Sequence, residues 1–258
     1  MRSRRMAKRA KVRGTPDAGL LADRIRAVQL QEGALPGADA VHEMRVATRR
    51  LRAALRLLRL TDLDQDVKAL QDALGEVRDL QLQVKWLRGR DANLLRSCRA
   101  RLAKAVNALQ RELRLWRSRT LPALLDAAAQ GPHVAKLSKL LRKRLRRLQQ
   151  RLERARARPT ARSLHAARIS VKQVRYLVEV AKASLPKKVT RLEADLKTLQ
   201  ASLGELHDVD ARLVLVKSRP ALARDQQEAR KQLSKVAAAQ LARWHRQRLI
   251  DHASAALP

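Results

Sequence analysis

The stretch VHEMRVATRRLR, residues 41–52, separates basic from apolar side chains with the period of an α-helix. At about 100° per residue, positions spaced three and four apart share one face. The basic face comprises His42, Arg45, Arg49, Arg52, Arg56 and Arg59, and the adjoining apolar face comprises Met44, Leu51, Leu55 and Leu58. The pattern predicts a helix whose apolar face is anchored in a core while its basic edge remains available for binding.

A second stretch, LHAARISVKQVR at residues 164–175, repeats this pattern. Its basic positions are His165, Arg168, Lys172 and Arg175. Another pair of similar blocks follows in the same order, LQDALGEVRD at 70–79 and LQASLGELHD at 199–208. Matching blocks in the same order indicate a tandem duplication with its seam at Gly131-Pro132. The sequence therefore predicts two similar helical halves related by a pseudo-two-fold axis.

The rest of the chain also has a helical pattern, so the expected fold class is all-α. Glycine and proline divide the sequence into segments that mostly follow a period of about 3.6 residues, and none alternates with period two. The predicted helices are 38–60, 62–87, 91–119, 134–156, 163–184, 187–217 and 221–255. Asp39 is the expected N-cap of the first of these helices.

The charge balance requires an anionic partner. The chain has 258 residues, of which 45% are hydrophobic, so it can bury a core. Its 58 Lys and Arg residues exceed its 24 Asp and Glu residues and give a formal net charge of +34. Candidate partners are nucleic acid, an anionic membrane surface or a polymeric inorganic anion.

Localisation signals point to the cytoplasm. Cys98 is the single cysteine, so an intramolecular disulfide and an all-cysteine metal site are excluded, which fits a reducing compartment. Residues 1–13 are basic but no apolar stretch follows them, so a secretory signal is not expected. No segment is apolar for long enough to span a membrane.

The basic stripe at residues 42–56 suits a linear polyanion. At about 1.5 Å per residue it extends roughly 20 Å, which is longer than a mononucleotide requires. Arginine forks bind pairs of phosphate oxygens, lysine adds a point charge and histidine donates from a ring nitrogen. One alternative is a merely solvated face. His42 and His165 have a second interpretation of their own, as structural residues near a helix start.

The two stretches 41–52 and 164–175 resemble the first-half and second-half signatures of the CHAD family, the conserved histidine α-helical domains. The resemblance covers nearly the whole chain from about Leu20. It implies a duplicated helical bundle that binds inorganic polyphosphate and, in some members, associates with polyphosphate granules. It implies no catalysis and no cofactor. The chain departs from the pattern at Gln173, where the first repeat has Arg50, and at Glu179, where it has Arg56.

The expected organisation is a flexible basic tail at 1–19 and a single, stand-alone CHAD domain at 20–258. Its halves are expected at about 20–130 and 131–258. A monomer is favoured. The predicted polyphosphate-binding residues are His42, Arg45, Arg49, Arg50, Arg52, Arg56, His165, Arg168, Lys172 and Arg175. Arg45, Arg49, Arg52 and Arg56 are expected to face Arg168, Lys172 and Arg175, with the two histidines at the near ends of the stripes.

Three other functions are alternatives. General nucleic-acid binding is the main one, although Trp86, Trp116, Trp244 and Tyr176 are scattered as if at core or boundary positions rather than on a stacking surface. An interaction scaffold for an acidic protein or an anionic membrane is another. The motif His207-Asp208-x-Asp210 suggests a metal-dependent phosphohydrolase. The repeat argues against the last, because arginine stands in the place of His207 in the first half and cannot bind a metal. No metal site and no catalytic residue is expected.

Overall fold

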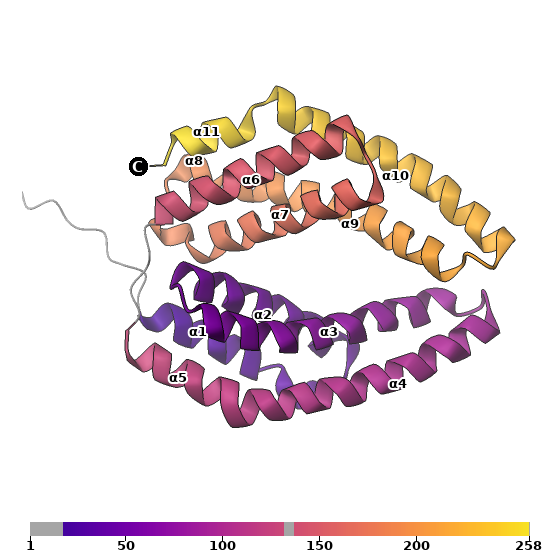
Figure 1. Cartoon of the computed structure of the whole chain (residues 1–258), viewed down its shortest axis with the longest axis horizontal. Helices are drawn as coiled ribbons and strands as arrows, with labels where there is room; N and C mark the ends of the chain where they lie inside the picture. Colours follow the sequence, from indigo (N-terminus) through magenta and orange to yellow (C-terminus); the bar gives the residue numbers. More distant parts are fainter. Residues whose placement is uncertain (1–17, 132–136, 258) are drawn as a thin grey trace, which may run out of the picture.

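The computed structural model describes residues 18–131 and 137–257, and all regular structure in these ranges is helical. The first half of the chain forms α1 (Ala18–Gln29), the 3-10 turn η1 (Glu32–Ala34), α2 (Ala38–Leu57), α3 (Thr61–Leu87), α4 (Ala92–Leu115), the π-helical turn η2 (Trp116–Thr120) and α5 (Leu121–Ala129). The second half forms α6 (Leu137–Ala157), α7 (Ala161–Val180), the 3-10 turn η3 (Lys182–Ser184), α8 (Lys187–Thr190), α9 (Leu192–Leu215), α10 (Pro220–Arg246) and α11 (Leu249–Ala255). The two sets occupy the lower and upper parts of Figure 1.

Each half buries its own apolar core. The first core gathers residues of α1 to α5, and the predicted apolar face of α2 lies in it. Met44, Leu51, Leu55 and Leu58 are all buried there, which confirms that face. The second core gathers α6, α7, α9, α10 and α11 around buried leucines such as Leu145 and Leu199. The apolar periodicity therefore predicted the side of α2 that packs inward.

The two halves share apolar surface at α2 and α7. Ala53, Ala54 and Leu57 of α2 belong to the core of the second half, with Val174 and Leu177 of α7. Small alanine side chains allow two helices to approach closely, which places the basic edges of α2 and α7 beside each other. This packing forms one end of the space between the halves.

The halves meet again at the far ends of two long helix pairs. Leu215 of α9 packs on a small cluster of α3 and α4 that includes Leu87 and Cys98. The Nε atom of Arg219 lies 2.6 Å from Oδ2 of Asp91, the N-cap of α4. The guanidinium of Arg212 lies 5.6 Å from the Trp86 ring centroid. We call this region the tip contact.

Several predicted helix boundaries need correction. The N-cap of α2 is Gly37 rather than Asp39, which lies in the first helical turn. The predicted helix 187–217 is divided at Arg191 into α8 and α9, and 221–255 is divided where Arg248 adopts a left-handed backbone with φ of 46°. The segment 91–119 is regular α-helix only to Leu115, and helix 163–184 ends at Val180.

Other expectations concern α1, the tail and the aromatic residues. The sequence patterns give no bounds for α1. The predicted tail lies outside the described residues except for its last two positions, and Pro132 of the predicted seam also lies outside them. Trp116, Trp244 and Tyr176 are buried, as expected for core positions. Within the described helices, none is long and apolar enough to cross a bilayer.

Candidate functional site

A groove of about 1130 Å³ lies between the two halves, bounded by the α2–α7 packing and reaching the tip contact at Trp86 and Arg212. Its cationic lining comprises Arg45, Arg49, Arg52, Arg56, Lys68, Lys85, Arg101, Arg144, Arg168, Lys172 and Arg212. Its carboxylate lining comprises Asp72, Glu76, Asp79 and Asp208. Cations therefore outnumber carboxylates in the lining of the groove.

The wall formed by α2 begins with Arg45 and Arg49. Nη1 of Arg45 lies 3.4 Å from Oδ1 of Asp79 on α3. Burial, and then the neighbouring charge of Arg49, lower the pKa of Arg45 from its usual value. Nη1 of Arg49 donates a long hydrogen bond of 3.5 Å to Oη of Tyr176 on α7. Arg49 thus reaches across the groove towards the second half.

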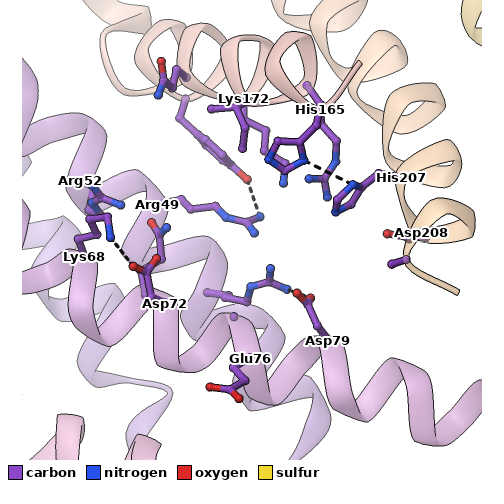
Figure 2. Close-up of a pocket in the computed structure, with 18 of the residues that line it drawn as sticks. Arg49, Arg52, Lys68, Asp72, Glu76, Asp79, His165, Lys172, His207 and Asp208 are labelled. Carbon is purple, nitrogen blue, oxygen red and sulfur yellow. Dashed lines mark hydrogen bonds and ion pairs between the residues drawn. The ribbon is translucent and has the colours of Figure 1, made fainter. Parts of the chain in front are cut away.

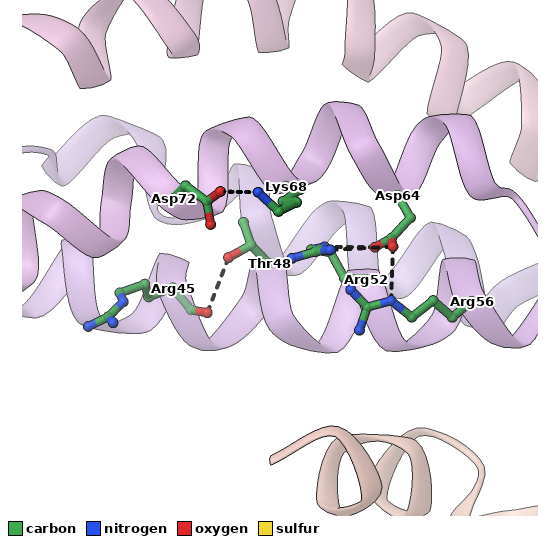
Figure 3. A network of polar contacts seen from close by, with 7 residues as sticks. All are labelled: Arg45, Thr48, Arg52, Arg56, Asp64, Lys68 and Asp72. Carbon is green, nitrogen blue, oxygen red and sulfur yellow. Dashed lines mark hydrogen bonds and ion pairs between the residues drawn. The ribbon is translucent and has the colours of Figure 1, made fainter. Parts of the chain in front are cut away.

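The α2 wall continues with Arg52 and Arg56, which share one carboxylate. Nε of Arg52 lies 2.7 Å from Oδ1 of Asp64, and Nε of Arg56 lies 2.9 Å from Oδ2 of the same residue (Figure 3). The Arg52 and Asp64 side chains are only 10% and 9% exposed. These two arginines are therefore partly neutralised and held in place, whereas Arg49 has no carboxylate partner among the described ion pairs.

Asp64 is not among the predicted site residues, although the sequence holds a signal for it. It stands in register with Val67, Leu70 and Leu74, the buried face of α3. A carboxylate at an apolar position of an amphipathic helix needs a buried cation or hydrogen-bond donor. The preceding helix supplies both arginines.

The wall formed by α7 presents Arg168, together with Lys172 and His165. Figure 2 shows the latter two side chains in the groove. Burial, together with Arg49, Arg168 and Arg45, lowers the pKa of Lys172 to about 6. The pKa of Arg168 is also lowered, first by burial. Like charges from both helices thus crowd the middle of the groove, and a bound anion would relieve their mutual repulsion.

His207 of α9 joins this wall. Its Nδ1 lies 3.5 Å from Nδ1 of His165, with the ring centroids 5.0 Å apart. Burial lowers the pKa of both histidines, with further lowering from the charge of Arg168. The sequence suggests His207 only as a metal ligand. Its pairing with His165 could not be predicted, because the two residues lie on different helices, α9 and α7, and their contact depends on how those helices pack.

The motif His207-Asp208-x-Asp210 does not converge on one point. Asp208 lines the groove, whereas Oδ1 of Asp210 lies 2.6 Å from Nε of Arg230 on α10. In the ranges 18–131 and 137–257, no group of three or more His, Cys, Asp or Glu side chains is arranged to hold a metal ion.

Three predicted binding residues lie outside the groove lining. His42 is 51% exposed, and its Nε2 lies 4.0 Å from Oε1 of Glu43. Nε of Arg50 lies 2.6 Å from Oε1 of Glu179. The Arg175 guanidinium lies 4.4 Å from the Tyr176 ring centroid. Among the predicted residues, Arg175 and His42 therefore do not contribute to the groove lining.

The structure brings the other predicted residues together. They are Arg45, Arg49, Arg52, Arg56, His165, Arg168 and Lys172. Arg144 of α6, Arg101 of α4 and Arg212 of α9 join them unpredicted. The sequences of α4 and α6 are visibly rich in cations, but periodicity alone does not tell which arginine meets the other half.

Comparisons with known proteins agree with this architecture. A family profile described as "CHAD domain" matches residues 19–217. The crystal structure of the CHAD domain from the plant Ricinus communis superposes with a TM-score of 0.59 at 25% sequence identity, covering 93% of this chain and 97% of that chain. A comparison with curated protein sequences found no significant match.

Proposed function

The chain belongs to the CHAD domain family, and on that premise we propose that it binds inorganic polyphosphate in the groove between its two halves. Binding is non-catalytic and needs no cofactor. The protein acts as a polyanion-binding module in the cytoplasm, with polyphosphate granules as a further place of action. The resemblance of residues 41–52 and 164–175 to the family signatures supports this choice of ligand.

The observation that carries the proposal is the meeting of two basic walls around one cavity. Arg45 and Arg49 from α2 lie close enough to Lys172 of α7 to lower its pKa. Guanidinium forks bind two oxygens of a phosphate, and lysine binds as a point charge. A linear polymer of phosphates offers anions to both walls along the groove, whereas one orthophosphate reaches only part of it.

We propose further that the two halves arose by tandem duplication and are related by a pseudo-two-fold axis. The repeated stretches lie on α2 and α7, and the second pair of similar blocks lies on α3 and α9. In each half the two helices of such a pair pack together, and α2 packs against α7. This arrangement supports a binding site built from equivalent helices of two repeats.

Non-specific nucleic-acid binding is a second candidate, favoured by exposed cations outside the groove. Lys143, Arg146 and Arg147 of α6 are such cations, and the described ion pairs include none of them. A surface of this kind attracts nucleic acids, which are polymers of phosphodiesters, by releasing their counterions. We expect this binding to be weaker and more sensitive to salt than binding in the groove.

A competition titration tests the ligand. Labelled long-chain polyphosphate is bound at physiological salt, and duplex DNA, RNA and short phosphates are added at equal phosphate concentration. Polyphosphate retained against all competitors supports a dedicated site. Equal competition by DNA or RNA overturns the proposal in favour of a general phosphate surface.

The absence of catalysis is tested separately. Polyphosphate is incubated with a molar excess of protein, with and without Mg²⁺ or Mn²⁺, and its chain length is followed by gel electrophoresis. An unchanged length distribution is expected. Shortening of the chains by the purified protein would contradict the non-catalytic proposal while leaving binding intact.

A further inference from the structure

We infer that the groove takes up a proton together with its anion, with the amine of Lys172 as the main proton acceptor and the His165–His207 pair as a second. This inference rests on the proposed polyphosphate binding and adds a regulation to the same site. Affinity then depends on pH through the protein, even where the charge of the ligand is constant.

The first observation is that Lys172 is crowded by cations without a counter-ion of its own. Arg45 and Arg49 face it from α2, and Arg168 lies one helical turn before it on α7. The negative charge of Asp79 on α3 acts to raise the pKa of Lys172, but this carboxylate pairs with Arg45. Within the described chain, no ion pair joins Lys172 to a carboxylate.

The surrounding elements do not supply the missing charge. The charged and titratable groups that line the groove on the elements around Lys172 include Arg45 and Arg49 on α2, Asp79 on α3, Arg144 on α6, His165, Arg168 and Tyr176 on α7, and His207 and Asp208 on α9. Arg144 donates a hydrogen bond of 3.2 Å to Gln173 beside it. Cations and neutral rings thus predominate on the elements that pack around the amine.

The consequence for Lys172 follows from its pKa of about 6. The free groove holds this amine mostly uncharged at neutral pH, although a lysine in water is charged there. A bound anion supplies the missing negative charge and raises the pKa towards the usual range. Binding near neutral pH therefore takes a proton from solution.

The two histidines offer a second place for protons. Their Nδ1 atoms lie 3.5 Å apart, so one hydrogen bond between neutral rings requires one proton between them. If both Nδ1 atoms carried protons, two donors would face each other beside Arg168, and burial with this neighbouring charge lowers the pKa of both rings. An anion that accepts hydrogen bonds from these rings favours their further protonation.

The sign and size of the effect follow from linkage. A base whose pKa rises on binding adds its full gain in affinity below its free-state pKa. The gain declines as pH rises from that value towards the bound-state pKa, and it is absent above the bound-state pKa. One proton taken up corresponds to a decrease of up to about tenfold in affinity per pH unit. For Lys172, the affinity should begin to fall with rising pH near the free pKa of about 6 and should continue to fall at higher pH.

Calorimetric titration of the full-length protein with long-chain polyphosphate tests the inference. Binding is measured near pH 7.5 in two buffers with different heats of ionisation, so that proton uptake appears as a difference in observed enthalpy. We expect an uptake approaching one proton per protein. Affinity should fall by up to about tenfold per unit between roughly pH 6.5 and 8.5.

Lys172→Arg is the matched variant, because it keeps a cation that does not titrate in this range. It should still bind, with proton uptake reduced by nearly one and a flatter pH profile. Subtracting the proton uptake of the variant from that of the wild type cancels the contribution of the ligand's titrating end groups, which is the same in both. An unchanged uptake in Lys172→Arg would show that Lys172 is not the acceptor.

The outcomes separate this inference from the proposed function. If the wild-type protein does not bind polyphosphate even near pH 6, the proposed function fails. If it binds equally at both ends of the pH range and takes up no proton, only the proton coupling fails. A pH-meter titration of the wild type in unbuffered solution measures the same proton uptake directly and needs no variant.

Discussion

On α2 the basic residues of the groove wall are all arginines, whereas on α7 they are an arginine, a lysine and a histidine. Asp64 neutralises part of the α2 wall by holding Arg52 and Arg56. On α7, the described ion pairs include no carboxylate that contacts Lys172. The pKa of the Lys172 amine is lowered instead. The two walls therefore limit their charge in different ways, one by pairing and the other by loss of a proton.

The formal charge of a basic stretch in the sequence is therefore not its charge in the folded protein. Both walls face the same electrostatic problem, because cations from separate helices are brought together away from water. Arginine remains charged under these conditions and needs a partner, whereas lysine and histidine can become neutral. The type of base at each position thus determines whether its charge is reduced by pairing with a carboxylate or by loss of a proton.

The largest expected effect comes from removing the carboxylate of the α2 wall. Asp64→Asn leaves two crowded guanidinium groups without their buried partner, which should lower the free energy of unfolding by about 3 kcal/mol. The melting temperature should fall by roughly 6–12 °C in calorimetry. Asp62→Asn on the exposed face of the same helix is the control and should change little. A stability loss equal to that of the control would contradict the buried pairing.

The next effect concerns binding by both walls at once. Arg49→Glu combined with Lys172→Glu should weaken polyphosphate binding on the order of 100-fold, because two repulsive charges enter the groove. Circular dichroism should show unchanged helical content. Arg111→Glu combined with Arg146→Glu makes the same change in formal net charge at exposed positions outside the groove. Equal losses in both double variants would mean that net charge, and not the groove, holds the ligand.

A smaller effect distinguishes the two repeated histidines. His165→Ala should weaken binding about fivefold, as expected for the loss of one hydrogen bond. His42→Ala should leave the affinity within about twofold, because His42 lies outside the groove lining. Both variants are titrated with polyphosphate beside the wild type. A greater loss in His42→Ala would place the ligand beyond the groove, along the start of α2.

The smallest effect concerns the pairing of Arg45 with Asp79. Asp79→Asn should release Arg45 for the ligand and raise the affinity by about two- to threefold, in keeping with an ion pair whose carboxylate is exposed. Glu205→Gln on α9 removes the same charge from an exposed position outside the groove lining. Only the first variant should bind more tightly. A decrease in Asp79→Asn would indicate that Asp79 positions Arg45 for binding.

The sequence predicted the helical fold and the basic faces of α2 and α7, because both depend on local periodicity. Met44 and Leu55 point into a core for the same reason that Arg45 and Arg49 point out of it. It did not predict that Asp64 would neutralise Arg52 and Arg56, since that contact depends on how α3 returns along α2. The pairing of His165 with His207 likewise depends on the packing of α9 against α7.

The departures from the repeat are also explained by contacts between distant segments. Glu179, which stands in the place of Arg56, pairs with Arg50 of the other half. Gln173, which stands in the place of Arg50, accepts a hydrogen bond from Arg144 of α6. Aligning the two repeats locates both positions, but only the tertiary structure gives each of them a partner.

The burial of Ala53, Ala54 and Leu57 in the second core has a thermodynamic consequence. Because one helix belongs to both cores, neither half can lose its structure without exposing apolar surface of the other. The chain should therefore melt in a single cooperative transition, with equal calorimetric and van't Hoff enthalpies. A fragment ending at the connection after α5 would expose these three side chains to water and should associate with itself or with the missing half.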